Sequence, residues 1–345
     1  MSSYVDLLNE IGENINIIVG ITFFSLGIIG NSLNILIFSS LLKTKIFPLS
    51  PVRLYLLTIS ISDLVFVGYL LLTRIFISGF LIPLTNTNEM ICKSRFYLGQ
   101  VSMFTSLYTT CFATIDQYLI SSRSVRIRQL SKISSTKIII LISILLWCSI
   151  NIPVLFLYKL YPKSNGSTVC TNNSPAWTFY YTYFQSLLFL CIIPLTIFII
   201  FNLLRRYNLH SVLQVDRSIV RQMNRMVYFQ SITMSISLFI STVQIIYQFL
   251  TMNIVKDSLR LAQDNIFNTV ANLLTYVNYI APFYIYLFSS KSLRRNFRNL
   301  LTNRQQILTI DFRTNLSKTQ GNQTTNINKI QPITTDNRPK LEDLH

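Results

Sequence analysis

Charged residues are scarce in this sequence. They make up 12% of its 345 residues, whereas hydrophobic residues make up 50%. A soluble domain of this size carries about twice that share of charge. The net charge of +17 does not indicate a nucleic-acid-binding protein, because the Lys and Arg residues lie in short gaps between long apolar runs. The composition predicts a membrane protein that contacts the lipid bilayer and has no nucleic-acid partner.

Histidine is almost absent, and the apolar segments contain no set of residues typical of catalysis. The two histidines, His210 and His345, lie in a loop and at the carboxyl terminus. No nucleophile, base and orienting group can be assembled around them. The first fifteen residues also lack Lys and Arg, which argues against a cleaved signal peptide. We therefore expect neither an enzyme nor a removed leader.

Seven long uncharged runs predict seven membrane-spanning helices. Crossing the hydrocarbon core takes about 20 apolar residues, and backbone groups cannot be left unpaired in lipid. Only the second and third runs contain a charged residue, namely Asp63 and Asp116. The fold class expected is an all-α membrane protein, a seven-transmembrane helix bundle. The spans are expected at residues 16–41, 55–72, 96–120, 138–158, 176–204, 226–252 and 265–289.

The distribution of basic residues predicts the orientation in the membrane. Four alternate connections, counting the carboxyl-terminal segment, hold 23 of the 30 Lys and Arg residues, and the other side holds 7. Positive residues accumulate on the cytoplasmic side of membrane proteins. We expect residues 1–15 to lie outside the cell, the bundle at 16–289 to cross the plasma membrane, and the carboxyl terminus to lie in the cytoplasm.

Five cysteines divide into two groups. Cys111, Cys148 and Cys191 fall inside predicted spans, where a buried thiol is the ordinary interpretation. Cys92 and Cys170 fall on the predicted outer side, where an oxidising compartment would let them pair. Two Asn-X-Ser motifs, which begin at Asn165 and Asn172, lie in the same outer loop and are candidate glycosylation acceptors.

The segment after the seventh span separates into a helix and a tail. Residues 290–301 place Leu293 and Phe297 on one side and arginines elsewhere, which predicts an amphipathic helix on an anionic membrane surface. A frayed extension of the seventh helix is the alternative. Residues 302–345 are rich in Asn, Gln and Thr and lack an apolar period, so we expect a disordered tail.

Landmark residues in almost every predicted span carry a family resemblance. The first span contains Gly30-Asn31, the third ends in Asp116-Gln117-Tyr118, and the fourth and fifth contain Trp147 and Pro194. Together with seven spans and two outer cysteines, they make residues 16–301 resemble the rhodopsin-like, or class A, G-protein-coupled receptors. The resemblance implies a plasma-membrane receptor for an extracellular ligand that signals to a heterotrimeric G protein.

The resemblance also implies a polar centre inside the bundle. Asp63 is similar to the family's sodium-binding aspartate, and Ser106 and Asn278 lie where further oxygen ligands are supplied. Asn31 is similar to an amide that ties neighbouring helices together. The alternative is a protonated Asp63 that hydrogen bonds to its neighbours. Apart from an allosteric sodium ion, the chain is expected to hold no cofactor and no other metal.

The cytoplasmic switch departs from the family pattern. The family has an arginine where this chain has Gln117, and the segment 239–244 lacks the sixth-helix Cys-Trp-x-Pro motif. Asn224 is uncharged where a partner acid is often found. These losses are consistent with a weaker inactive-state lock, a different coupling geometry, or a weakly coupling or decoy receptor.

The seventh span leaves the register of the switch tyrosine open. Either Pro282 aligns with the family's proline and the tyrosine is lost, or Tyr286 aligns, as the distance to the following amphipathic helix favours. Below the sixth span, Arg217, Arg221 and Arg225 recur every four residues and share one helical face. They are expected to meet a G protein, or alternatively lipid headgroups.

Residues in the predicted extracellular half of the bundle and in its outer connections indicate the class of ligand. Gly99 stands where amine receptors carry an aspartate, and the seventh span has no retinal-type lysine. Acidic residues outside favour a basic peptide ligand. A small neutral chemical or lipid is the alternative ligand, and a membrane transporter is the alternative of another class. The predicted pocket, for which ordinary packing is the alternative at each position, comprises Gln100, Tyr108, Tyr180, Tyr183, Gln244, Tyr247, Gln248 and Asn272.

Overall fold

The part of the chain that the structure describes is mostly helical. The computed structural model describes residues 2–43, 51–120, 122, 124–162, 168–172, 174–176, 184, 217–252 and 254–301. It forms two compact units, Met1–Arg294 and Arg295–His345, and the first contains the bundle. The elements are α1 (Ser2–Lys43), α2 (Pro51–Val65), η1 (Phe66–Leu71), α3 (Leu72–Arg74), η2 (Ile75–Gly79), α4 (Leu84–Thr87), α5 (Glu89–Ile120), α6 (Val125–Arg128), α7 (Ile133–Leu157), β1 (Lys159–Pro162), β2 (Thr168–Thr171), α9 (Arg217–Thr251), α10 (Ser258–Ile280), α11 (Pro282–Ser289) and α12 (Lys291–Leu301).

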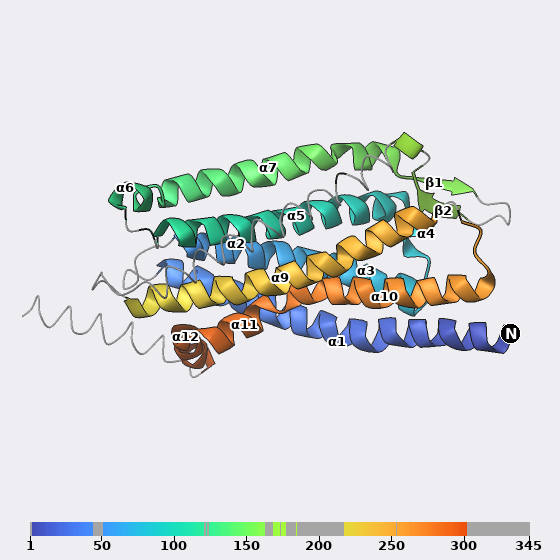
Figure 1. Cartoon of the computed structure of the whole chain (residues 1–345), viewed down its shortest axis with the longest axis horizontal. Helices are drawn as coiled ribbons and strands as arrows, with labels where there is room; N and C mark the ends of the chain where they lie inside the picture. The colour runs from blue at the N-terminus through green and yellow to red at the C-terminus, as the bar shows by residue number, and fades with distance from the viewer. Residues whose placement is uncertain are drawn as a thin grey trace, which may run out of the picture. The chain divides into compact units, whose positions relative to one another are not determined.

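The long helices of the first unit run lengthwise beside one another (Figure 1). The start of α1, the short helix α4 and the hairpin β1–β2 gather at one end of this bundle, and α6 and α11 lie at the other. The connections therefore alternate between two ends, as the predicted topology requires. Six of the seven predicted spans lie on described helices. The fifth, 176–204, lies outside the described residues apart from Ala176 and Phe184.

Apolar side chains face outward on these helices, which is the arrangement that lipid favours. By length and composition, four described segments can cross a membrane: Tyr4–Ser39, Pro51–Gly79, Ile133–Leu157 and Arg225–Thr251. On α7, large apolar residues such as Ile138, Leu141 and Leu145 are more than half exposed. In water such a surface marks an interaction site, whereas in a bilayer the hydrocarbon chains cover it. The all-α membrane bundle predicted from the sequence is confirmed.

The bundle interior combines aromatic packing with buried polar groups. Phe66 packs against Tyr279 with ring centroids 4.1 Å apart, and Phe104 stacks on Trp147 at 4.5 Å. Such aromatic pairs add roughly 0.5–1.5 kcal/mol beyond the area that they bury. Leu107 lies in the same cluster and is completely buried. This cluster joins η1, α5, α7 and α10 at the level of the polar centre described below.

The helix that contains Asp63 is interrupted by two π-helical segments. η1 and η2 flank the short α3, and the helical path continues to Gly79, seven residues beyond the predicted end of the second span. No proline lies within Pro51–Gly79 after its first residue, so the wide turns are not caused by a missing backbone donor. A π turn changes the rotational phase of every residue that follows it. The segment thereby sets the direction in which Arg74, at the end of α3, leaves the helix.

Helix α1 begins well before the predicted first span. It covers Ser2–Lys43, a length of about 63 Å at 1.5 Å per residue, whereas a hydrocarbon core is about 30 Å thick. The helix therefore includes the acidic segment 1–15 from its second residue onward. At the other end of the described chain α12 forms the predicted helix after the seventh span. Its place on a membrane surface stays a prediction, and residues 302–345 lie outside the described part.

Glycine permits close contact between α1 and the π-helical part of the second span. A methyl group added at Gly27 would lie 2.7 Å from Cγ1 of Val67, and one at Gly20 would lie 2.9 Å from Cγ1 of Ile75. Carbon atoms do not pack that closely, so these positions require the hydrogen-only side chain. Gly68, in contrast, would place its methyl group 3.4 Å from Cδ1 of Ile28, the mobile end of a long side chain.

We predict that Gly27→Ala destabilises the folded chain although alanine favours helix formation. Both Gly27→Ala and Gly68→Ala gain roughly 0.5–1 kcal/mol of helix propensity. Only the former forces a branched side chain away from its neighbour, at a penalty of about 1–3 kcal/mol. Thermal unfolding of the purified chain in nanodiscs measures the difference. An unfolding midpoint of Gly27→Ala at or above that of Gly68→Ala would contradict the packing described here.

Candidate functional site

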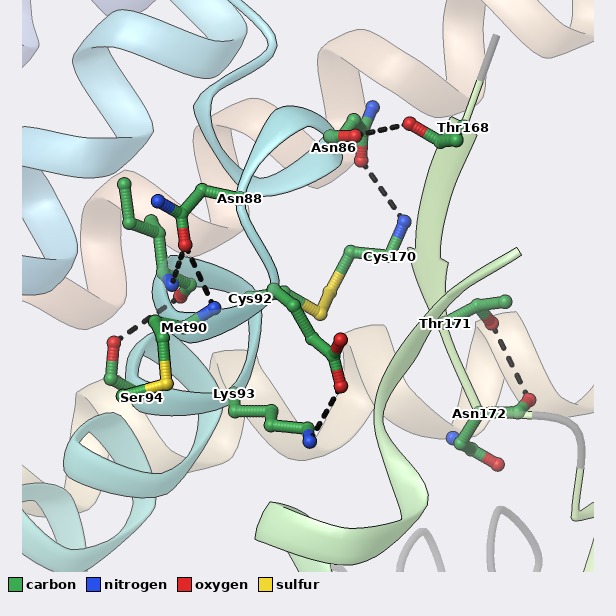
Figure 2. The surroundings of a disulfide bond; sticks show 12 residues. Asn86, Asn88, Met90, Cys92, Lys93, Ser94, Thr168, Cys170, Thr171 and Asn172 are labelled. Carbon is green, nitrogen blue, oxygen red and sulfur yellow. Dashed lines mark hydrogen bonds and ion pairs between the residues drawn. A yellow bond between two sulfur atoms is a disulfide. The ribbon is translucent and has the colours of Figure 1, made fainter. Parts of the chain in front are cut away.

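A disulfide bond connects the outer end of α5 to the β-hairpin. Cys92 and Cys170 are bonded across 78 residues, with their Cα atoms 5.8 Å apart, which confirms the predicted pair. The backbone N–H of Cys170 donates to Oδ1 of Asn86 at 3.1 Å, and the hydroxyl of Thr168 donates to the carbonyl of the same residue. Figure 2 shows how these bonds hold β2 against α4. The hairpin is thus fixed at the end of the bundle where α1 begins.

The start of α5 is capped at the same place. Oδ1 of Asn88 accepts hydrogen bonds from the backbone N–H groups of Met90 at 2.8 Å and Ile91 at 3.3 Å (Figure 2). Such a cap satisfies donors that have no partner within the helix. Lys93 pairs with Glu89 at 2.6 Å, and this contact holds the pKa of the Glu89 carboxyl below its usual value. Helix α5 therefore begins at Glu89, seven residues before the start of the predicted third span.

The outer loop contains one described glycosylation candidate. Asn172 follows β2, and its side chain interacts with the Tyr158 hydroxyl at the end of α7. Asn165 lies outside the described residues. Glycosylation at either position stays a prediction. Of the remaining cysteines, Cys111 is buried and free, Cys148 is half-buried and free, and Cys191 lies outside the described part.

A cavity of about 330 Å³ lies between the outer parts of five elements: η1, α3, α5, α9 and α10. Four of the eight predicted pocket residues line it: Gln100, Gln244, Gln248 and Asn272. Gln244 and Gln248 donate to Oδ1 of Asn268 at 3.4 and 3.0 Å, which holds the α9 amides beside α10. Ser241 and Thr275 connect the same two helices through a hydroxyl contact of 2.7 Å.

The structure does not place the other four predicted pocket residues in this cavity. Tyr108 is turned toward α7, where it packs against Trp147 with ring centroids 4.7 Å apart. The hydroxyl of Tyr247 donates to Asp264 at 2.6 Å, and Lys256 pairs with the same carboxylate at 2.5 Å. These two contacts hold the pKa of Asp264 below its usual value. The prediction that Tyr108 and Tyr247 line the pocket is therefore corrected. Tyr108 packs against α7, and Tyr247 bonds to Asp264 outside the cavity lining. Tyr180 and Tyr183 lie outside the described residues.

Sequence reasoning missed two arginines in the cavity wall. Arg74 and Arg95 both line the cavity, from α3 and from the second turn of α5. The predicted spans ended at residue 72 and began again at residue 96, so both arginines counted as loop charges. One feature of the sequence could have indicated them: Arg74 lies two residues after one predicted span, and Arg95 lies one residue before the next. An arginine so placed belongs to a continuing helix as readily as to a loop.

A polar centre lies at the core of the bundle. Asp63 is fully buried, and its Oδ1 accepts a hydrogen bond from Ser106 at 2.5 Å. Asn31 donates from Nδ2 to the backbone carbonyl of Tyr279 at 2.9 Å and so ties α1 to α10. Asn278 is also buried, and no bond between it and Asp63 occurs in the described structure. Three oxygens in this centre accept no hydrogen bond from any described group: Asp63 Oδ2, Asn31 Oδ1 and Asn278 Oδ1.

The predicted switch residues lie toward the opposite end of the bundle. Oδ1 of Asp116 accepts a hydrogen bond from Ser131 at 2.5 Å, which ties α5 to the turn after α6. Gln117 is almost completely buried, whereas Tyr118 is half-buried. Tyr286 is fully buried and packs edge-to-face against Phe38, with centroids 6.1 Å apart. Pro282 is buried as well, so the register of the switch tyrosine stays a prediction.

Helix α9 carries the basic stripe and one contact that the sequence did not indicate. Arg217, Arg221 and Arg225 all lie on α9, and the side chain of Arg225 is exposed. The side chains of the other two lie outside the description. Near them, Oε1 of buried Gln222 accepts a hydrogen bond from the hydroxyl of Ser290 at 3.0 Å. Ser290 stands between α11 and α12, so this bond links the start of α9 to the end of the seventh span.

A cavity, a disulfide-bonded hairpin and a buried aspartate within an α-helical membrane bundle are the features expected of the predicted seven-helix receptor, of which six spans are described. The sequence profile described as 7 transmembrane receptor (rhodopsin family) matches residues 33–286. The chain belongs to this family, as the landmark residues implied. The family is one of receptors and not of enzymes.

Individual relatives are more distant. Galanin receptor type 1 of Rattus norvegicus is 27% identical over 190 residues, which cover 51% of this chain and 53% of that receptor. The human galanin receptor type 1 is 28% identical over 182 residues, or 49% and 50% of the two chains. Somatostatin receptor type 4 of Rattus norvegicus is 23% identical over 282 residues, or 80% and 69%. The chain thus spans about half the length of the galanin receptors that it matches.

Proposed function

We propose that this chain is a plasma-membrane receptor that binds an extracellular peptide and signals to a heterotrimeric G protein. The cavity at the disulfide-bonded end of the bundle is the observation that carries the proposal. Similarity to receptors named for galanin and somatostatin supports a peptide as the ligand class. The excess of basic residues at the opposite connections supports an extracellular amino terminus and a cytoplasmic carboxyl terminus.

Ligand binding acts on this bundle by favouring an arrangement that admits the G protein. The size of that effect is limited by the difference in ligand affinity between the two arrangements. Helix α9 is continuous over 35 residues and contains no proline. Sharp kinks occur mainly at proline, at Gly/Ser pairs or at π turns, so this helix is expected to move as a rod. Arg217, Arg221 and Arg225 on its cytoplasmic face are the proposed contacts with the G protein.

The proposal is tested with the full chain expressed in cells that carry a promiscuous G-protein sensor. A library of synthetic peptides is applied, and G-protein dissociation is recorded for the wild-type chain and for Gln117→Arg. We expect at least one peptide to activate both chains, with a larger response from Gln117→Arg because a guanidinium forms stronger hydrogen bonds than an amide. Flux of an ion or substrate through the wild-type chain, with no G-protein response from either chain, would favour a transporter and refute the proposal.

The closed arrangement is proposed to depend on the bond between Gln222 and Ser290. We predict that Gln222→Ala and Ser290→Ala each raise ligand-independent G-protein activation roughly five-fold, the effect of losing about 1 kcal/mol of hydrogen bonding. The double variant should match Ser290→Ala, because both substitutions remove the bond between the two side chains, and Ser290→Ala also removes the bond that its hydroxyl accepts from the Leu293 backbone N–H at 3.2 Å. Thr233→Ala is the control, since its hydroxyl bonds only within α9, to the carbonyl of Phe229 at 3.0 Å. Additive effects, or unchanged basal activity in both single variants, would exclude this role.

The polar centre is proposed to hold an allosteric sodium ion. Its three buried oxygens without partners, from Asp63, Asn31 and Asn278, are of the kind that a hard cation prefers. The residues present therefore fit the ion, and Asp63 would neutralise its charge. A bound sodium ion would hold the helices that supply these oxygens in one arrangement.

We predict that sodium chloride raises the unfolding temperature of the purified chain relative to choline chloride at equal ionic strength. Sodium at ten times its dissociation constant adds about 1.4 kcal/mol to the folded state. Asp63→Asn should abolish the difference between the two salts, whereas Asp116→Asn should preserve it. Equal unfolding temperatures of the wild-type chain in both salts would leave the hydrogen-bonded, protonated Asp63 as the correct description.

A further inference from the structure

Two arginines project into the outer cavity from neighbouring helices. Nε of Arg74 donates to Oδ1 of Asn16 on α1 at 3.2 Å, and Nε of Arg95 donates to Oγ1 of Thr73 at 3.0 Å. A guanidinium has five N–H donors, four of which are on its terminal nitrogens. Within the described part of the chain, the terminal nitrogens of both arginines have no hydrogen-bond acceptor. Both side chains are half-buried and line the cavity, so these donors face it.

Among the described residues, neither arginine has an acidic partner. No carboxylate of the described residues forms an ion pair with Arg74 or Arg95, whereas Glu89 pairs with Lys93 and Asp264 with Lys256. The sequence between Glu89 and Asp216 contains one acid, Asp116, at the far end of α5, so the part of the fifth span outside the description supplies none. The six acids that the topology places outside are Asp6, Glu10, Glu13, Glu89, Asp257 and Asp264, and none of them lines the cavity.

Two like charges in a partly dehydrated space are unfavourable without a counter-charge. Removal of a guanidinium from water has a large electrostatic penalty, and the mutual repulsion of two adds to it. Charged side chains at membrane depth are accordingly rare and mark functional sites. The local structure nevertheless holds both arginines in place through their Nε donors. Such an arrangement is expected where the missing negative charge arrives with a ligand.

We propose that Arg74 and Arg95 together bind a carboxylate group of the extracellular peptide ligand. This inference rests on the proposed receptor function and specifies the chemistry of its ligand. The planar fork of a guanidinium matches the two oxygens of a carboxylate. Peptides carry this group at the carboxyl terminus and on Asp and Glu side chains. Around the arginines, Gln100, Asn272 and the ring of Tyr276 supply neutral polar and aromatic surface for the residues next to the carboxylate.

Gly99 and Leu70 pack closely in the same cavity wall. At Gly99, where amine receptors carry an aspartate, an added Cβ would lie 2.5 Å from Cδ2 of Leu70, so a side chain there would require Leu70 to move. The α5 backbone is therefore in contact with the Leu70 side chain of η1, and no acidic side chain stands at this position to pair with the arginines. The acids outside the membrane favoured a basic peptide. For the group of that peptide that enters the cavity, the two arginines favour an acidic group instead.

The experiment uses the full-length chain in lipid nanodiscs and a random octapeptide library. The library is synthesised in two forms that differ only in a free carboxylate or an amide at the carboxyl terminus. Binders are selected on the wild-type chain and measured on Arg74→Gln, Arg95→Gln and the control Arg260→Gln, an exposed arginine of α10 that does not line the cavity. Enrichment restricted to the free-acid library indicates the terminal carboxylate, and enrichment of Asp or Glu in both libraries indicates a side chain.

We expect wild-type binders to be enriched in carboxylates and to lose roughly ten- to hundred-fold in affinity on either cavity variant, as for charged hydrogen bonds elsewhere. Arg260→Gln should bind them like the wild-type chain. Arg74→Lys and Arg95→Lys keep the charge but lose the fork, and should show intermediate affinities. The unfolding temperatures of the glutamine variants without peptide should equal or exceed the wild-type value, because their repulsion is reduced; a decrease would indicate structural arginines and overturn the assignment.

Other outcomes separate the carboxylate site from the receptor function. Binders with no preference for a carboxylate, terminal or on a side chain, affinities unaffected by both glutamine variants, or no binder at all would overturn the carboxylate site. If binders without this preference still activate the G protein, the proposed receptor function is supported and the carboxylate site is refuted. Acidic binders that are lost in the variants support the site even when no G protein responds, and the failure then belongs to the coupling.

Discussion

The hydrocarbon environment is the constraint on which the rest of this structure depends. Lipid offers no hydrogen bonds, so each spanning segment must satisfy its own backbone as a helix, and polar side chains must turn toward other helices. The outward faces of α7 and α1 are accordingly apolar, with Ile18 and Leu141 largely exposed. Asn31, Asp63 and Ser106 are turned inward and fully or almost fully buried. The bundle thus has a polar interior because it has an apolar surface.

Because the polar side chains are turned inward, the candidate functional residues lie inside the bundle, along its axis. A buried amide that reaches another helix, such as Asn31 on the Tyr279 carbonyl, fixes the relative height of two spans. Buried oxygens without partners remain where the helices cannot satisfy every group, and they are sites at which an ion or water lowers the free energy. At the outer end, the Cys92–Cys170 bond holds the hairpin in one place without any need for apolar packing. The cavity there can therefore be polar and still have a defined shape.

Much of the fold followed from the sequence because hydrophobicity is the dominant signal in a membrane. Long uncharged runs located the six described spans, and the two outer cysteines located the disulfide. Asp63 and Ser106 were paired correctly because family spacing fixes their depth, and α2 up to Asp63 is a regular helix.

The parts that could not be predicted depend on rotation about helix axes and on helix ends. Two π segments between Phe66 and Gly79 alter the phase of the second span, and no proline or glycine pattern in the sequence announces them. The predicted span ended at residue 72, whereas the helical path continues to Gly79, so Arg74 was not assigned to the cavity. Tyr108 was placed in it, although its actual direction, toward Trp147, is set by packing with α7. Helix α1 extends to Ser2 through acidic residues that carry no hydropathy signal for a membrane helix.

Neutral amides occupy the half of the bundle away from the disulfide, where the family commonly uses charges. Gln117 is buried, Gln222 accepts a bond from Ser290, and Gln230 donates to the carbonyl of Asn278 at 3.5 Å. A neutral hydrogen bond contributes about 1 kcal/mol net, less than a charge-assisted bond. In the proposed receptor, several weak contacts of this kind would replace one strong lock, so that the closed arrangement would be more stable than the open one by only a small free energy. A moderate difference in ligand affinity then suffices to shift the populations, since about 5.5 kcal/mol already reverses a ratio of 1:99. On this view the loss of the arginine weakens both the closed arrangement and the coupled one, and the easier opening offsets only part of the weaker coupling.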